Sequence, residues 1–190
     1  MFLYSSFERI IELNNYLMDD DIRELGRLND VSFIRNRKLP FEDISMLILN
    51  KRGMTQAMEL YYFYKEKEME SVSNAAFSKS RVNLNPKLFN VLNRRYLSKI
   101  YENTEYKTFM GLKLLAIDGS IQELLNEANL REEYGGITNE NGEVIHVNAR
   151  SSGIYDCLNN MMIDFQIAPY KTSEKKLAII KHRKYVKVFQ

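Results

Sequence analysis

The sequence predicts an α+β protein: an N-terminal helical domain over residues 1–106, then a domain over 107–190 with three antiparallel strands followed by a helix. Three observations lead to this fold class. Apolar residues recur at helical spacing through about the first hundred residues. A short apolar run of strand length then ends at Asp118. Two further strand-like runs are separated by Asn159-Asn160, and because Asn tolerates positive φ, this pair predicts a hairpin.

Each expected helix of the first part begins at a residue that favours a helix start. Ser, Thr, Asp and Asn can accept hydrogen bonds from the free amides of a first turn, and Pro is favoured at a first helical position. These starts are Ser6, Asp19, Pro40, Thr55, Ser73 and Asn85-Pro86. Gly53 is expected to end the third helix, because glycine commonly follows a helix.

The second part begins with a strand over about 112–118, which the apolar run predicts to be buried. Residues 121–134 are expected to be helical and residues 135–148 to form a polar loop. The hairpin around Asn159-Asn160 follows, and a terminal helix begins after Ser173. Strand, insertion, hairpin and helix in this order are the opening of an RNase H-like fold, in which the first strand lies centrally and bears an Asp.

Composition places the chain among ordinary globular proteins. It has 190 residues, of which 45% are hydrophobic and 27% charged. No apolar run approaches the roughly 20 residues of a membrane helix, and the N-terminus lacks the pattern of a signal peptide. The single Cys157, expected to be buried, excludes an internal disulfide and a Cys-rich zinc site. We therefore expect a cytoplasmic protein without a membrane partner.

Charge is distributed unevenly along the chain. Residues 31–115 contain fifteen basic and eight acidic residues, a net charge of +7, whereas residues 1–30 carry −4 and residues 116–190 carry −1. A basic segment of this kind indicates a polyanionic partner such as nucleic acid. The alternative is a solvated basic face that binds nothing.

Four segments together resemble one protein family. They are Arg35–Gly53, Val72–Pro86, Leu114–Ser120 and Ala149–Glu174. Their order and spacing are similar to those of bacterial DDE transposases of the insertion-sequence-four group, from about Arg35 to His182. The resemblance implies a helical DNA-binding region and an RNase H-like catalytic domain. It also implies double-stranded DNA at the ends of a mobile element as partner, and two Mg²⁺ or Mn²⁺ ions as cofactors for cutting and joining that DNA.

The resemblance makes Asp118 the first catalytic Asp and a metal ligand. The family's second Asp, in an Asp-Arg-Gly-Tyr-like motif, and its Glu, in a Tyr-Arg-Glu-Lys pattern, have no counterpart here. We therefore expect a transposase truncated after the first part of its catalytic domain, and inactive, because a single carboxylate cannot hold two ions in line. Without the resemblance, Asp118 would be a strand-end residue in a turn with Gly119 and Ser120. Asp156 and Asp164 are expected to be ordinary polar strand residues, and Glu174 a first-turn carboxylate favoured by the helix dipole.

Six basic residues are candidate DNA contacts: Arg35, Arg37, Lys38, Lys79, Arg81 and Arg150. The first three precede a helix start, where they could bind phosphates. Lys79 and Arg81 lie in the helix expected after Ser73, which follows two other helices as the reading helix of a helix-turn-helix does. A packing helix with incidental charges explains the same pattern equally well. Arg150 is a candidate through the resemblance.

Two other functions remain open. The chain could be a non-catalytic DNA-binding fragment that contacts and inhibits a full-length transposase. It could also be an unrelated phosphatase with Asp118 as nucleophile, as in haloacid dehalogenase-like enzymes. Those enzymes need a second Asp two positions later, where this sequence has Ser120.

Overall fold

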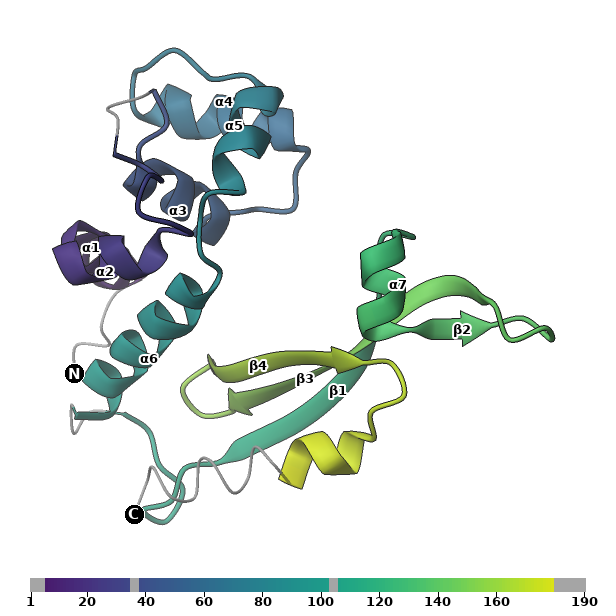
Figure 1. Cartoon of the computed structure of the whole chain (residues 1–190). Helices are drawn as coiled ribbons and strands as arrows, with labels where there is room; N and C mark the ends of the chain where they lie inside the picture. Colours follow the sequence, from purple (N-terminus) through teal and green to yellow (C-terminus); the bar gives the residue numbers. More distant parts are fainter. Residues whose placement is uncertain (1–5, 35–37, 103–105, 180–190) are drawn as a thin grey trace. The chain divides into compact units, whose positions relative to one another are not determined.

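The chain divides into two compact units, Met1–Glu102 and Asn103–Gln190. The computed structural model describes residues 6–34, 38–102 and 106–179. The first unit is helical, and the second combines an antiparallel sheet with short helices (Figure 1). The expected α+β class is confirmed at this level, and the boundary at Glu102 lies four residues before the one expected at residue 106.

The described residues of the first unit form six helices: α1 Ser6–Met18, α2 Asp20–Gly26, α3 Phe41–Leu49, α4 Gln56–Glu66, α5 Asn74–Arg81 and α6 Lys87–Glu102. The expected cap at Ser73 is confirmed, since its hydroxyl accepts a hydrogen bond from the Ala76 amide at 3.2 Å. Two expected boundaries are wrong. Pro40 precedes α3 rather than opening it, and α3 ends at Leu49 rather than at Gly53.

Contacts with α4 explain the early end of α3. The amides of Arg52 and Met54 both donate to the Glu59 carboxylate, at 2.7 and 3.0 Å. They therefore satisfy their hydrogen bonds outside α3. Gly53, with φ +79°, turns the chain between them in a conformation that favours glycine.

A single apolar core holds this unit together. Its buried residues come from all six helices and from two connections: Leu17, Ile22, Leu39, Phe41, Ile44, Leu47, Leu60, Tyr64, Phe77, Leu84, Leu88 and Leu92. The end of α2 approaches α3 so closely that a Cβ on Gly26 would lie 2.4 Å from the Phe41 ring. The Gly26 carbonyl also accepts a hydrogen bond from the Asn85 amide at 2.8 Å, which ties α2 to the start of α6.

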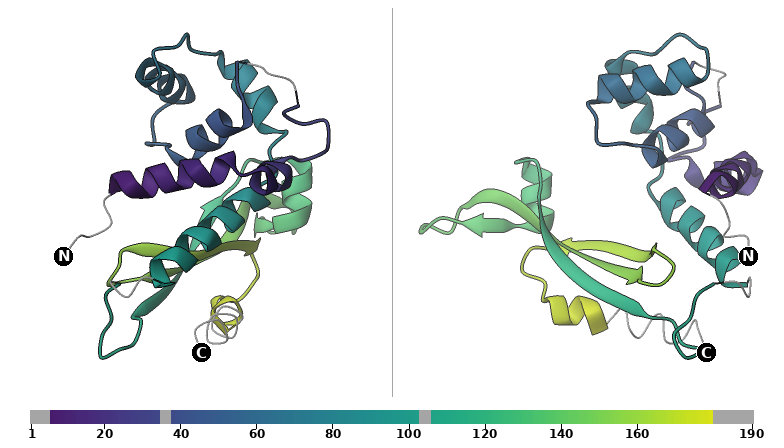
Figure 2. Two further views of the ribbon diagram at one scale, coloured as in Figure 1. Left: turned by 90° about the vertical axis from the view of Figure 1, so that its left-hand side faces the viewer. Right: turned by 180° about the vertical axis from the view of Figure 1, so that it is seen from behind.

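Over residues 106–179 the second unit contains four strands, all paired antiparallel: β1 Leu115–Glu123, β2 Gly136–Thr138, β3 Val144–Asp156 and β4 Met161–Pro169. Helix α7, Ala128–Tyr134, lies between β1 and β2, and residues 174–179 form a further helical turn against the sheet (Figure 2). Every other strand pairs with β3, with β1 at one edge. The predicted hairpin is confirmed, with Asn160 at φ 53°.

Several expectations for this unit are wrong. The first strand runs to Glu123, the expected helix over 121–134 is reduced to α7, and the expected loop over 135–148 contains β2 and the start of β3. The Asp118 strand is neither central nor buried among the described residues: each of its residues is exposed or half-buried. The reason is the length of β3, which pairs β1 along one side and β4 along the other.

The core of this unit is small. Its buried apolar residues are Val147, Ala149, Ile154, Met161, Ile163 and Leu177. Many large apolar side chains remain exposed, including Ile117, Ile121 and Phe165. None of the helices that the structure describes, in either unit, combines the length and the apolar character needed to cross a bilayer.

Candidate functional site

Helix α5 is the best-formed candidate site of the first unit. It contacts both α3 and α4, so the three helices form one packed group. Ser73 caps its N-terminus, and the Gln56 side chain at the start of α4 donates to the Asn74 carbonyl at 3.1 Å. The connection over residues 67–73 is longer than the three or four residues usual in a helix-turn-helix. The group is therefore a looser variant of that arrangement.

Phe77 is the only fully buried side chain of α5, and most of the others are exposed. Phe77 is 2% exposed and belongs to the core. Asn74, Ser78, Lys79 and Arg81 are exposed. The Arg81 guanidinium lies 5.9 Å from the centre of the Phe77 ring, and in the part of the chain that the structure describes neither Lys79 nor Arg81 joins an ion pair. The helix therefore exposes two cations together with hydrogen-bonding side chains.

The expected cluster at the start of α3 is only partly described. Arg35 and Arg37 lie outside the described residues. Lys38 is exposed and pairs with Glu70 at 2.9 Å, a hydrogen bond that lowers the pKa of the Glu70 carboxyl. An exposed pair of this kind is weak and exchanges readily for a phosphate. Lys38 therefore remains available to an anionic partner.

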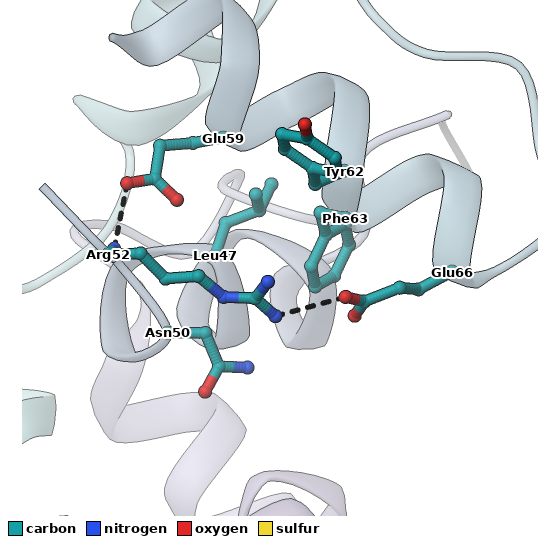
Figure 3. Close-up of a pocket in the computed structure, with 7 residues that line it drawn as sticks. All are labelled: Leu47, Asn50, Arg52, Glu59, Tyr62, Phe63 and Glu66. Atoms are coloured by element: carbon teal, nitrogen blue, oxygen red, sulfur yellow. Dashed lines mark hydrogen bonds and ion pairs between the residues drawn. The ribbon is translucent and has the colours of Figure 1, made fainter. Parts of the chain in front are cut away.

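A small pocket lies between α3 and α4. Arg52 crosses it, with its guanidinium 3.0 Å from the Glu66 carboxylate and its backbone amide 2.7 Å from Glu59 (Figure 3). Leu47 and Phe63 form its apolar wall. Its volume of about 20 Å³ is large enough for one or two water molecules and too small for an organic ligand. The pocket therefore serves to fix the connection between the two helices.

Asp118 occupies the middle of an exposed edge strand, not the end of a buried one as expected. It pairs in register with Gly153 of β3, and its side chain is exposed. Two residues further along the strand, the Ser120 hydroxyl lies 2.9 Å from the hydroxyl of Ser151. Gln122 donates to both hydroxyls, at 3.0 and 3.3 Å. Asp118 therefore belongs to a polar face of hydroxyl and amide groups.

Arg150 and Glu174 lie on the other face of the sheet. Arg150 pairs in register with Ile121, three residues from Asp118, and side chains alternate between faces along a strand. Its guanidinium is 2.6 Å from the Glu174 carboxylate and 6.0 Å from the centre of the Tyr170 ring. The structure thus brings Arg150 and Glu174 together and separates both from Asp118. A DNA contact by Arg150 has to compete with this ion pair.

Asp156 has a structural role that the sequence did not reveal. Its side chain is fully buried, and one carboxylate oxygen accepts hydrogen bonds from the amides of Leu158 and Asn159, both at 3.1 Å. The other oxygen accepts from the Asn159 side chain at 2.9 Å. Burial lowers the pKa of Lys113, and the Asp156 charge opposes that shift. The signal available in the sequence was an Asp two residues before the turn, the spacing of an Asx turn.

The residues described do not fit a two-metal site. Such a site needs several carboxylates facing the same two ions. Asp118 lies on one face of the sheet, whereas Glu174 lies on the other face and pairs with Arg150. The Asp156 carboxylate already accepts hydrogen bonds from the turn of the hairpin. Within the described ranges, no group of three His, Cys, Asp or Glu side chains gathers to hold a metal ion. Cys157, expected to be buried, is exposed and unpaired as a thiol.

Neither protein-family models, nor curated proteins, nor solved structures gave a match to this chain.

Proposed function

We propose that this chain is a DNA-binding protein of DNA transposition, related to the DDE transposases of the insertion-sequence-four group. Its first unit binds double-stranded DNA, with the ends of a mobile element as the specific target. Helix α5 is the contacting helix, and Lys79 and Arg81 are its phosphate ligands. Such a protein works in the bacterial cytoplasm, at the nucleoid.

The exposure of α5 is the observation that carries this proposal. A helix used only for packing buries a stripe of side chains, whereas α5 buries Phe77 alone. Its remaining surface is rich in the side chains that contact phosphates and base edges, namely Lys, Arg, Ser and Asn. The net charge of +7 over residues 31–115 adds a general attraction to DNA.

The second unit supports the proposed ancestry by its order of elements. Strand β1 bears Asp118, an insertion with α7 and β2 follows, and then come the β3–β4 hairpin and the helix at residues 174–179. This is the order expected for the first half of an RNase H-like domain. The polar face around Asp118 is where that domain's chemistry would be based.

A non-catalytic fragment that inhibits a full-length transposase is the second candidate. The position of Glu174 favours it, because this carboxylate pairs with Arg150 on the face opposite Asp118. The carboxylates of the unit therefore do not converge on one point. Both candidates share the binding of DNA and differ in whether strand cleavage follows.

A binding titration tests the shared part. The intact chain is mixed with a fluorescent DNA duplex at several salt concentrations. The affinity should fall as salt rises, because each phosphate contact releases counterions, with a slope of about −0.9 per contact in a double-logarithmic plot. The double variant Lys79→Ala/Arg81→Ala should bind at least about tenfold more weakly at low salt and reduce the slope by roughly 2.

Lys175→Ala/Lys176→Ala is the matched control. It removes the same charge from exposed positions of the second unit and should leave both affinity and slope unchanged. Equal losses in the two double variants would show that binding depends on net charge and not on α5. Absence of binding at low salt would exclude DNA as the partner.

A further inference from the structure

One edge of β1 has no partner strand in the described part of the second unit. Among the described residues, β3 is the only partner of this nine-residue strand. Natural edge strands are usually protected by Lys, Pro or a β-bulge. Strand β1 contains neither Lys nor Pro, and its register with β3 runs without interruption from Leu115 to Glu123. Asp118 and Glu123 are its only charged residues, so a pairing strand has to keep like charges away from these two positions.

Two hydrogen bonds show which backbone groups face the open side. The Leu124 amide donates to the Val147 carbonyl at 2.8 Å, and the Leu114 carbonyl accepts from the Cys157 amide at 3.0 Å. Successive residues of a strand direct their amides and carbonyls to opposite edges. The even-numbered residues between these two points therefore direct their amides and carbonyls at β3. The odd-numbered residues, including Ile117, Gly119 and Ile121, therefore present their amides and carbonyls to the open edge.

The strand is complementary to itself in the antiparallel direction. A two-fold axis through Gly119, the middle residue, pairs all nine positions of the strand with those of a second copy. The residues whose backbone groups face the open edge then lie opposite each other. Ile117 then lies opposite Ile121 of a second copy, and Asp118 lies opposite Ser120. The two isoleucines are 41% and 48% exposed, so pairing covers apolar surface that one copy leaves in water.

Neighbouring registers fit less well. An axis at Asp118 places two carboxylates opposite each other, and like charges in direct opposition destabilise a sheet. An axis at Ser120 places Ile117 opposite Glu123 and Ile121 opposite Gly119, so the isoleucines no longer pair, and an axis at Ile121 leaves Ile117 without a partner in the strand. The axis at Gly119 confines the opposition of Glu123 to Leu115, at the two ends of the ladder. The axis at Gly119 also leaves room for Glu174, whose Cγ would lie 3.2 Å from a Cβ at that glycine. The Glu174 charge is matched by Arg150 within each copy, at 2.6 Å.

We propose that two copies of this chain pair through β1, antiparallel about Gly119, and form one continuous sheet across the dimer. The four isoleucines lie together on one face of this sheet, and the two Asp118 carboxylates lie on the other. The inference depends only on the second unit and is independent of DNA binding by α5.

Sedimentation of the intact chain over a wide range of concentration tests the association. Wild-type chain should move from monomer to dimer, and Ile121→Lys should remain monomeric where the wild type is dimeric. Ile145→Lys is the matched control, since Ile145 is 47% exposed and belongs to the part of β3 beyond the β1 ladder. It should dimerise as the wild type does, and circular dichroism should show both variants folded.

Disulfide cross-linking tests the register. In a Cys157→Ser background, one chain carries Asp118→Cys and another carries Ser120→Cys. The register places these two positions directly opposite each other as a non-hydrogen-bonded pair, about 4.5 Å between Cα atoms. Mild oxidation of the mixture should give a covalent heterodimer, whereas each chain alone should cross-link poorly.

Three results would overturn the proposal. They are a monomer at every concentration, equal loss of the dimer in Ile121→Lys and Ile145→Lys, and cross-linking of the mixture no better than of either chain alone.

Discussion

Replacing Asp156 should destabilise the second unit more than any other single change to an acidic residue there. The carboxylate is fully buried and accepts two backbone hydrogen bonds and one from the Asn159 side chain. Asn159 in turn bonds both the amide and the carbonyl of Lys107, at 2.8 and 3.0 Å. One side chain therefore orders the β3–β4 turn and the segment that leads towards β1.

The magnitude follows from the number of bonds lost. In Asp156→Ala the amides of Leu158 and Asn159 lose their acceptor inside the turn. Bonds to a charged group contribute about 1.5–3 kcal/mol, so a total loss of about 3 kcal/mol is expected when the turn partly relaxes. In Asp156→Asn one oxygen still serves both amides, and the loss should be about 1 kcal/mol.

Hydrogen exchange during urea unfolding of the intact chain measures these losses. Peptides from residues 144–169 report on the sheet, and peptides from the first unit provide an internal reference. Glu132→Ala, which removes the same charge from an exposed position of α7, should change the free energy of unfolding by less than about 0.5 kcal/mol. If Asp156→Ala were no more destabilising than Glu132→Ala, the structural role assigned to this carboxylate would be refuted.

Three further outcomes are expected. Ser73→Ala should lower the free energy of unfolding by about 1 kcal/mol in a urea titration, whereas Thr55→Ala, at an N-cap without a side-chain bond, should have little effect. Burial and the nearby Asp43 raise the pKa of Tyr64 from 10.0 to about 12, so the unfolded chain releases this proton first and stability should fall as pH rises between these values. Tyr64→Phe should flatten that fall, and an unchanged slope would contradict the assignment. The chain should cut supercoiled plasmid in Mg²⁺ or Mn²⁺ no faster than Asp118→Ala does, because one carboxylate does not hold two ions in line. Metal-dependent cleavage that is lost in Asp118→Ala would contradict this expectation.

The sequence by itself determined that the first unit is helical, although not the bounds of α3, and it determined the β3–β4 hairpin. Helix starts depend on contacts within a few residues, such as the Ser73 hydroxyl and the Ala76 amide. The turn at Asn160 likewise depends on the local tolerance of Asn for positive φ. Both signals are complete within a short window, so no tertiary contact was needed to predict them.

Tertiary structure alone decided the extent and position of β1. The expected helix over 121–134 lost its first residues to the strand, because Ile121 pairs with Arg150 some thirty residues away. A window of sequence does not contain that partner. The same long-range pairing placed β1 at the edge of the sheet, with Asp118 on an exposed face, although the apolar run had predicted a buried strand.

The candidate site also combines features that the sequence predicts with features that only the tertiary structure decides. Lys79 and Arg81 were predicted from a helix that the sequence defines locally, and the structure added that Phe77 alone anchors it. The separation of Asp118 from Arg150 and Glu174 could not be predicted, because the face on which each side chain lies depends on the register of β1 against β3. A shift of one residue in that register would exchange the faces, and only the packed sheet fixes it.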